Sequence, residues 1–452
     1  MPRRTGAETS AETGKNRLDL SRGPNSANVL YLAKSERREF LSESMGPVPP
    51  SDEVAPGSRL PALSAVMPSS ATPASRAHPP KWILWAIAIL GIVANVAQWS
   101  QKYDQISIGG NDFLAYYAGG KLTTDPGLYD PARVVQEQFK AAGIAGVALP
   151  VSRLPVFTAF MAPLVRLPYR TAYVVFQALS LLAVVLAVLL WPAREHRGAM
   201  AIACCWSVPL SAAFANGQDI TFLLLSLSIV ARLIDRRPAL AGIAASLCLA
   251  KFHLFLLVPL WILSQRRWRF AAGLAGGVLA CIAASFALQG PDWIHRYVHL
   301  IISPVESPDQ AFMLNLHGLC YTFGLPLAVE LAMSGVVAWL VWMVCRNAPE
   351  NAWVATLAGG LLVSRHAYTQ DCLILLPSLV LMLCAQKTAM PLRALAGILL
   401  VPVLYTPAVA RYPGAVIVPL VMLALVVMCS VNPAAPAALR VAAPAGGGAT
   451  AG

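Results

Sequence analysis

Long apolar stretches alternate with short polar ones from about residue 82 to residue 430. Several of the apolar stretches run for roughly 15–20 residues, close to the length that a helix needs to cross a bilayer. The weak ten-residue alternation typical of a transmembrane β-barrel is not seen. The pattern therefore predicts an all-α polytopic membrane protein.

The apolar stretches predict about twelve membrane helices. These are placed at residues 82–100, 171–191, 199–214, 219–234, 238–250, 253–264, 271–288, 325–345, 352–364, 371–386, 392–410 and 414–430. Residues 153–170 are apolar but short and interrupted by proline, so they form either a juxtamembrane helix or a thirteenth span. The pair 238–250 and 253–264 is too short for two full crossings, and a re-entrant hairpin, sheltered by protein or a water-filled cavity, is the alternative. The expected number is therefore eleven to thirteen.

Both ends of the chain differ from this middle part. Residues 1–80 are rich in Ser, Pro and Ala with mixed charge, and they have no sustained apolar period. We expect a disordered tail without a cleaved signal peptide; a true start at Met45 or Met67 is the alternative. Residues 431–452 are of low complexity and are also expected to be disordered. The membrane domain is thus predicted at residues 81–430.

Composition agrees with this class and orients the chain. Hydrophobic residues make up 57% and charged residues 12%, against about 25% charged residues in soluble domains. The net charge of +12 comes largely from basic clusters at 194–197, 235–237 and 266–269, with Arg346 and Lys387, all predicted on one side. The positive-inside rule makes that side, and both termini, cytoplasmic, so a nucleic-acid partner is not needed. The nine cysteines lie mostly in apolar runs without a CxxC pair and are expected to be inert thiols.

Acidic and aromatic residues gather on the other side, in the long loop 101–152. Asp112 follows the first predicted span closely, so it is either the N-cap of a helix or a general base at the membrane interface. Tyr116 and Tyr117 follow one turn later, as sugar contacts or as members of an interfacial belt. Asp125 and Asp130, in "DPGLYDP", are expected to be turn residues.

Lys251 stands in an apolar run, in "CLAKFHLF", beside His253. An ionisable residue at such a place is a candidate functional residue, and a lipid phosphate is a natural partner. The alternative is that its side chain extends to a nearby interface.

Two outer turns carry further candidates. In "SRHAYTQD", Arg365 and His366 could bind phosphate, whereas an ion pair between Arg365 and Asp371 would merely close the turn. In "NGQD", Gln218 and Asp219 stand at a span terminus, where capping explains them equally well. The three histidines of the outer loop 289–318 lack a tight metal spacing, and Asp112 has no second acid beside it. No cofactor is therefore expected, with a divalent metal as the less favoured alternative.

Four stretches carry a family resemblance in the same order along roughly residues 80–430. They are "NDFLAYYAGGKL" with the later "GLYD", "NGQDITFLLLSL", "RPALAGIAASLCLAKFHLFLLVPLWILSQRRWR" and "SRHAYTQDCLILLP". Together they resemble glycosyltransferase family 87, formerly a domain of unknown function, within the GT-C superfamily. Arg365 replaces a common proline, and Phe252-His253 replaces the usual continuation after the lysine.

The resemblance implies a GT-C-like membrane enzyme of the bacterial inner membrane. Such enzymes transfer mannose or a pentose, with inversion, from a polyprenyl-phosphate donor on the outer face. The first-loop base of the family maps onto Asp112, its hairpin lysine onto Lys251 and its late histidine onto His366. A lipid-borne donor also fits the lack of a GxGxxG-plus-acid pattern and of a P-loop.

The sequence thus predicts a glycosyltransferase whose partners are a polyprenyl-phosphate sugar, a lipid or glycan acceptor and the bilayer. Asp112 is expected to be the base, and Lys251, Arg365 and His366 are expected to bind the donor phosphate. The sugar or acceptor contacts are expected to be Tyr116, Tyr117, Gln218 and Asp371. Two alternatives are a lipid-linked-sugar flippase, which would spread charges through the middle of several spans, and an O-antigen-type polymerase or ligase, which would carry a larger Arg-rich outer loop.

Overall fold

A computed structural model describes residues 81–107, 111–143, 149–303, 310–385, 387–409 and 413–431. These residues form helices and connecting turns with no strand among them, which confirms the all-α class. The two predicted tails, apart from Val431, lie outside the described residues, as do residues 304–309 of the predicted outer loop 289–318.

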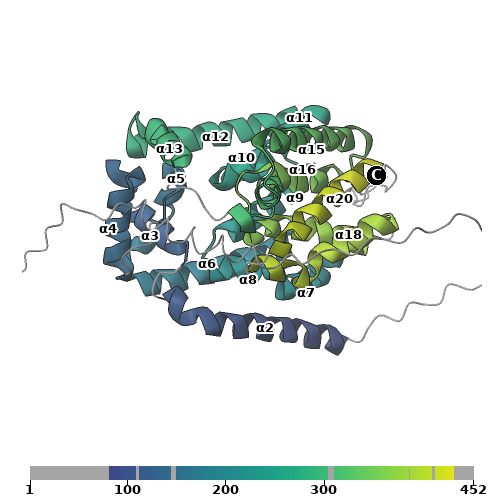
Figure 1. Cartoon of the computed structure of the whole chain (residues 1–452), viewed down its shortest axis with the longest axis horizontal. Helices are drawn as coiled ribbons and strands as arrows, with labels where there is room; N and C mark the ends of the chain where they lie inside the picture. Colours follow the sequence, from purple (N-terminus) through teal and green to yellow (C-terminus); the bar gives the residue numbers. More distant parts are fainter. Residues whose placement is uncertain are drawn as a thin grey trace, which may run out of the picture. The chain divides into compact units, whose positions relative to one another are not determined.

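The helices follow one another along the chain as labelled in Figure 1. The α-helices are α2 (Lys81–Ser107), α3 (Phe113–Lys121), α4 (Pro131–Ala142), α5 (Pro155–Ala159), α6 (Tyr169–Leu190), α7 (Arg197–Trp206), α8 (Val208–Ala215), α9 (Ile220–Leu233), α10 (Pro238–Ala245), α11 (Val258–Ser264), α12 (Trp268–Gln289), α13 (Trp293–Ile302), α14 (Leu316–Thr322), α15 (Leu327–Asn347), α16 (Ala352–Val363), α17 (Leu376–Cys384), α18 (Met390–Leu400), α19 (Thr406–Val409) and α20 (Ile417–Val431). Short 3-10 helices are η1 (Pro126–Tyr129), η2 (Leu164–Arg166), η3 (Arg194–His196), η4 (Ser246–Phe255), η6 (Gln310–Phe312), η7 (Thr369–Leu375), η8 (Pro402–Tyr405) and η9 (Pro413–Val416).

Fewer helices than expected are long and apolar enough to cross a membrane. Within the described ranges there are four: Tyr169–Leu190, Pro238–Phe255, Trp268–Gln289 and Leu327–Asn347. Two bent pairs, Arg194–Trp206 with Val208–Ala215 and Met390–Leu400 with Pro402–Val409, raise the number to six if each pair is one span. The structure therefore establishes four to six candidate spans and does not confirm twelve.

Proline breaks the predicted helices at identifiable places. The 56° bend between α7 and α8 falls at Ser207, whose hydroxyl accepts a hydrogen bond from the Leu210 amide and so starts a new helix just before Pro209. The 63° bend after α18 falls at Val401, the residue before Pro402, where an α conformation is disfavoured. Residues 153–168 contain only the short helices α5 and η2, and residues 169 and 170 begin α6, so this segment gives no spanning helix of its own.

Residues 238–264 form a hairpin with Lys251 at its middle. Asp235 and Arg267, which flank the segment, form an ion pair at 3.2 Å, so the chain returns to the end from which it left. The turn lies at Lys251, whose φ of −133° and ψ of 53° interrupt the helix. Each arm has about 13 residues and spans about 20 Å, short of the roughly 30 Å of a bilayer core. The hairpin alternative from the sequence is supported, although Pro238–Phe255 is long enough for a span.

The first arm of the hairpin lies unusually close to α12. A Cβ atom at Gly273 would stand 1.9 Å from the Ala239 carbonyl oxygen, and one at Gly242 would stand 2.2 Å from the Phe270 carbonyl oxygen. Glycine at both positions lets the two backbones touch. The hairpin is thus fixed against a long helix, with its tip free to meet the turns described next.

Polar turns and basic clusters lie at opposite ends of several helices. Helix α9 runs for 14 residues, about 21 Å, from Asp219 to the basic cluster 235–237. Helices α6 and α17 likewise begin beside the polar turns and end before the basic cluster 194–197 and Lys387. Helix α2 packs along α7, and Figure 1 shows it beside that helix. Which end faces the cytoplasm remains a prediction from the positive-inside rule.

Candidate functional site

Asp112 stands immediately before α3, but its carboxylate does not cap that helix. The Asn111 side chain takes that role, because its Oδ1 accepts a hydrogen bond from the Phe113 amide at 3.0 Å. The Asp112 amide donates to the Asn216 carbonyl at 3.0 Å, and its Oδ2 accepts a hydrogen bond from Gln218 Nε2. The carboxylate is therefore directed towards the "NGQD" turn.

That turn depends on glycine. Gly217 has a φ of +60°, a conformation that residues with a Cβ rarely adopt. A Cβ here would also lie 2.7 Å from the Phe113 Cβ. Gly217 thereby lets the turn approach the start of α3, which brings Gln218 to Asp112.

The amide of Gln218 has a fixed orientation. Its Oε1 accepts hydrogen bonds from Lys251 Nζ at 2.8 Å and from the Tyr116 hydroxyl at 3.1 Å. Because both groups donate, the oxygen must face them, and the NH₂ group must face Asp112. Gln218 is 6% exposed, so water does not compete for these bonds.

Lys251 is 4% exposed and does not extend to an interface. Its Nζ lies 2.7 Å from Asp371 Oδ1 and 3.8 Å from Asp219 Oδ1. The other oxygen of Asp371 accepts a hydrogen bond from the Tyr368 amide at 2.9 Å. Asp371 therefore pairs with the hairpin tip rather than with Arg365, whose side chain is exposed.

Arg153 and Asp219 form a second ion pair within the same network. The guanidinium meets both carboxylate oxygens, with Nε 2.8 Å from Oδ2 and Nη2 3.1 Å from Oδ1. The same Nη2 donates to the Tyr116 hydroxyl at 2.8 Å, and the guanidinium lies over the Tyr116 ring at 5.2 Å. This fork joins the loop before α5 to the start of α9.

Sequence reasoning missed the role of both members of this pair. Arg153 opens the apolar segment 153–170, which we interpreted by its hydropathy alone, and capping explained Asp219 as well as a functional role did. The available signal was Arg153 itself, an arginine at the start of an apolar segment with no acidic residue close to it in the sequence.

The three carboxylates of the network differ in their partners. Asp219 and Asp371 each contact a cation, whereas Asp112 forms no ion pair with any residue that the structure describes. Burial raises the pKa of Asp112, and the more distant Lys251 and the Gln218 bond oppose this only in part. Burial also acts to raise the pKa of Asp219, but Arg153 and Lys251 outweigh it and hold that pKa below its ordinary value. Asp112 is therefore the carboxylate best suited to accept a proton.

Two histidines flank the network on the side of Asp371. The His366 ring lies 5.9 Å from the His253 ring and 5.1 Å from the Tyr368 ring, centroid to centroid. Burial, only partly opposed by Asp371, lowers the pKa of His366 to about 4. At neutral pH this imidazole is uncharged, and it can offer a hydrogen bond but no positive charge.

The remaining sequence candidates lie outside the network. Tyr117 is buried and donates to the Leu167 carbonyl at 2.8 Å, with its ring packed edge-on against Tyr169. Asp125 accepts a hydrogen bond from the Gly127 amide, and Asp130 caps α4, so both have the predicted turn role. Among the described residues, no three His, Cys, Asp or Glu side chains are placed to hold a metal ion.

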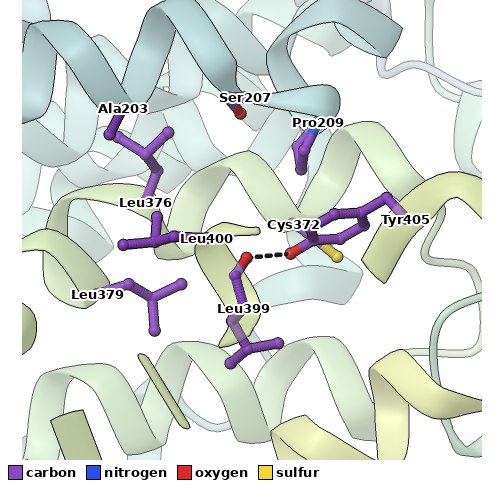
Figure 2. A pocket seen from close by; sticks show the side chains of 9 residues that line it. All are labelled: Ala203, Ser207, Pro209, Cys372, Leu376, Leu379, Leu399, Leu400 and Tyr405. Carbon is purple, nitrogen blue, oxygen red and sulfur yellow. Dashed lines mark hydrogen bonds between the residues drawn. The ribbon is translucent and has the colours of Figure 1, made fainter. Parts of the chain in front are cut away.

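An apolar cavity next to η7 is too small for a substrate. Its volume is about 10 Å³, room for a single water molecule. Figure 2 shows the Tyr405 hydroxyl donating to the Leu399 carbonyl there, and none of the nine lining residues is charged. Its lining residue Cys372 is the chain neighbour of Asp371, so this cavity lies beside the network without giving access to it.

Comparison with known families gives a match to part of the chain. The model of glycosyltransferase family 87 matches residues 155–377, a range that contains Gln218, Lys251 and Asp371 but begins after Asp112 and Arg153. Neither among curated proteins nor among solved structures is there a significant match. The match confirms, over residues 155–377, the resemblance to glycosyltransferase family 87 found in the sequence, and this family implies a membrane glycosyltransferase.

Proposed function

We propose that the protein is an inverting GT-C-type enzyme of the bacterial inner membrane, acting at the outer face. It transfers a hexose, of which mannose is the leading candidate, or a pentose from a polyprenyl-phosphate donor to a hydroxyl group of a lipid or glycan acceptor. Asp112 is the general base. The observation that carries this proposal is that, among the residues that the structure describes, Asp112 neither caps a helix nor pairs with a cation, while a fixed amide orients it.

The proposed step uses one proton transfer. Asp112 takes the proton of the acceptor hydroxyl while that oxygen attacks the anomeric carbon from the face opposite the phosphate. A bond forms between the acceptor oxygen and this carbon, and the bond from the carbon to the phosphate oxygen breaks. The polyprenyl phosphate leaves with the electron pair, and the sugar is inverted. A carboxyl with a raised pKa is a stronger proton acceptor than an ordinary aspartate once it is ionised.

The donor phosphate requires positive charge or hydrogen-bond donors. Arg365 is exposed and offers a bidentate fork, and His366 offers an uncharged donor next to it. Lys251 already shares its charge with Asp371, and its ammonium group already donates two hydrogen bonds, to Gln218 and to Asp371. We therefore propose Arg365 and His366 as the phosphate contacts, with Lys251 supporting them from the hairpin tip.

The sugar and the acceptor meet the polar side chains around Asp112. Tyr116, Gln218 and Asp371 belong to this network, and we propose them as sugar or acceptor contacts, as the sequence suggested. The hydroxyl of Tyr117 donates to the Leu167 carbonyl and its ring packs against Tyr169, so we propose that Tyr117 stabilises the position of α3 and does not contact the sugar. A site about 21 Å along α9 from the basic turn lies at a depth that a lipid-borne sugar can reach.

The test compares wild type with Asp112→Asn in proteoliposomes given radiolabelled polyprenyl-phosphomannose and an acceptor extract. Asparagine can still accept the hydrogen bond from Gln218 but cannot take a proton. We expect transfer to fall by about 10²–10⁴-fold, the range of general-base catalysis. Asp130→Asn is the matched control, because asparagine caps a helix as well as aspartate does.

Equal transfer by Asp112→Asn and wild type would remove the role of Asp112 and leave the enzyme class. Label that crosses the bilayer in both proteins, without transfer, would instead establish the flippase alternative. If neither transfer nor crossing occurs with mannose, the mannosyl donor is excluded and the pentosyl donor is tested in the same pair of proteins.

A further inference from the structure

A basic pocket lies at the base of the hairpin, at the opposite end of α9 from the Asp112 network. It has a volume of about 460 Å³. One wall is the turn after α9, with Asp235 and Pro238, and the other is the start of α12, with Arg266, Arg267 and Arg269. Since α9 is about 21 Å long, this pocket is distinct from the proposed transfer site.

The charges of this pocket are not balanced. Arg267 pairs with Asp235 at 3.2 Å and lies over the Trp261 ring at 5.3 Å, so its charge is partly used within the protein. Arg266 and Arg269 are exposed and form no ion pair with any residue in the described ranges. The guanidinium groups of Arg266 and Arg269 are therefore available to bind an external anion in this pocket.

The backbone and the neighbouring side chain indicate what kind of anion this is. Arg266 has a φ of +51°, a conformation that a residue with a Cβ adopts only when its surroundings impose it. Trp268 is 58% exposed beside the arginines, and exposed tryptophan next to basic residues is typical of the level of lipid headgroups. The positive-inside rule accounts for basic residues in this turn, but it does not account for a hollow between them.

We propose that this pocket binds the phosphate headgroup of an anionic phospholipid, with Arg266 and Arg269 as its ligands. Arginine binds phosphate oxygens bidentately, and basic pockets between membrane helices accept anionic headgroups. The pocket lies at the open end of the hairpin, so a bound headgroup joins the turn between α9 and α10 to the start of α12.

The test uses the full-length protein in a neutral detergent and follows its thermal unfolding while phosphatidylglycerol, phosphatidylcholine or inorganic phosphate is added. We expect phosphatidylglycerol to raise the melting temperature and phosphatidylcholine to leave it unchanged. In Arg266→Gln/Arg269→Gln the apparent dissociation constant for phosphatidylglycerol should increase about tenfold or more, since each basic group near an anionic surface contributes substantially.

Two further variants separate the pocket from total charge. Arg194→Gln/Arg346→Gln removes the same two charges from exposed positions elsewhere and should bind phosphatidylglycerol as wild type does. Arg266→Lys/Arg269→Lys keeps the charge, removes the fork and should bind with intermediate strength. Equal loss in the pocket variant and the Arg194/Arg346 variant, or equal stabilisation of wild type by phosphatidylcholine, would overturn the proposal. Full stabilisation by inorganic phosphate, with no further effect of phosphatidylglycerol, would overturn the lipid as its source.

Discussion

Gln218 is the residue that connects the buried charges to the proposed base. Its oxygen accepts from Lys251 and Tyr116, and its NH₂ group donates to Asp112. The network contains three carboxylates and two cations, and the amide lets the third carboxylate stay near a cation without pairing with it.

Gln218→Glu should move the pH dependence of transfer towards higher pH. A second carboxyl group beside Asp112 raises the pKa of the pair, and Asp112, as the proposed base, can act only after losing its proton. The acidic limb of the rate profile, already displaced upwards by the raised pKa of Asp112, should therefore lie higher still. Transfer rates between pH 4 and pH 9 measure this shift.

Gln136→Glu adds the same charge at an exposed position of α4 and is the control. A profile that shifts equally in both variants would mean that net charge, and not contact with Asp112, moves the limb.

Arg153→Met should destabilise the protein by about 3 kcal/mol, because it leaves Asp219, whose side chain is only 19% exposed, without its bidentate partner. Thermal or denaturant unfolding of purified protein measures this loss. Adding Asp219→Asn should recover part of it, since the uncompensated charge is then removed. An unchanged stability of the single variant would show that the pair contributes nothing net to folding.

Sequence alone identified Asp112, Lys251, Gln218 and Asp371 as candidates, because an ionisable or polar residue at the edge of an apolar run is unusual. It could not pair them. Asp371 is 120 residues from Lys251, and local spacing offered only Arg365 as an alternative partner. Arg153 was missed for the same reason, since its acid is 66 residues away.

The hairpin 238–264 is the element that carries Lys251 to the network, and its packing depends on glycine. Hydropathy predicted two short segments here and left a hairpin as the alternative, because length alone cannot show where the ends meet. The Asp235–Arg267 pair and the close contact with α12 supply that information. Twelve spans are not confirmed, because within the described ranges five further apolar helices are only 10–17 residues long and two other apolar runs are bent, at Ser207 and Val401.

Gly273→Ala should displace the first arm of the hairpin and reduce both stability and transfer. The new methyl group would stand 1.9 Å from a backbone carbonyl, which cannot move without moving the arm. We expect a loss of about 1–3 kcal/mol in stability. Unfolding and transfer measured on the same preparation check both effects.

Gly276→Ala, in the same helix, is the matched control, because nothing lies within 4 Å of its added Cβ. It should leave stability unchanged or slightly increased, since alanine favours a helix over glycine. Equal destabilisation by both substitutions would point to the helix itself and not to its contact with the hairpin.

Over the whole molecule, the polar network and the basic turns define two ends, and their orientation is open to direct measurement. The positive-inside rule predicts that the basic end is cytoplasmic. Asp130→Cys should then react with a membrane-impermeant maleimide in intact cells. Arg236→Cys should react only after the membrane is opened, with the parent chain and its nine cysteines measuring the background. The reverse pattern of labelling would invert the orientation and place the transfer site in the cytoplasmic leaflet.

The long separation between the hairpin tip and its counter-ion affects how the protein is made. At about 5–20 residues per second, a ribosome needs about 6–24 s to progress from Lys251 to Asp371. During that interval the lysine has already been synthesised, but its nearest carboxylate has not. Gln218 and Asp219 precede Lys251 in the chain and already lie within its reach in the folded protein. The tip of the hairpin can thus mature in two stages during translation, first against these two residues and then against Asp371.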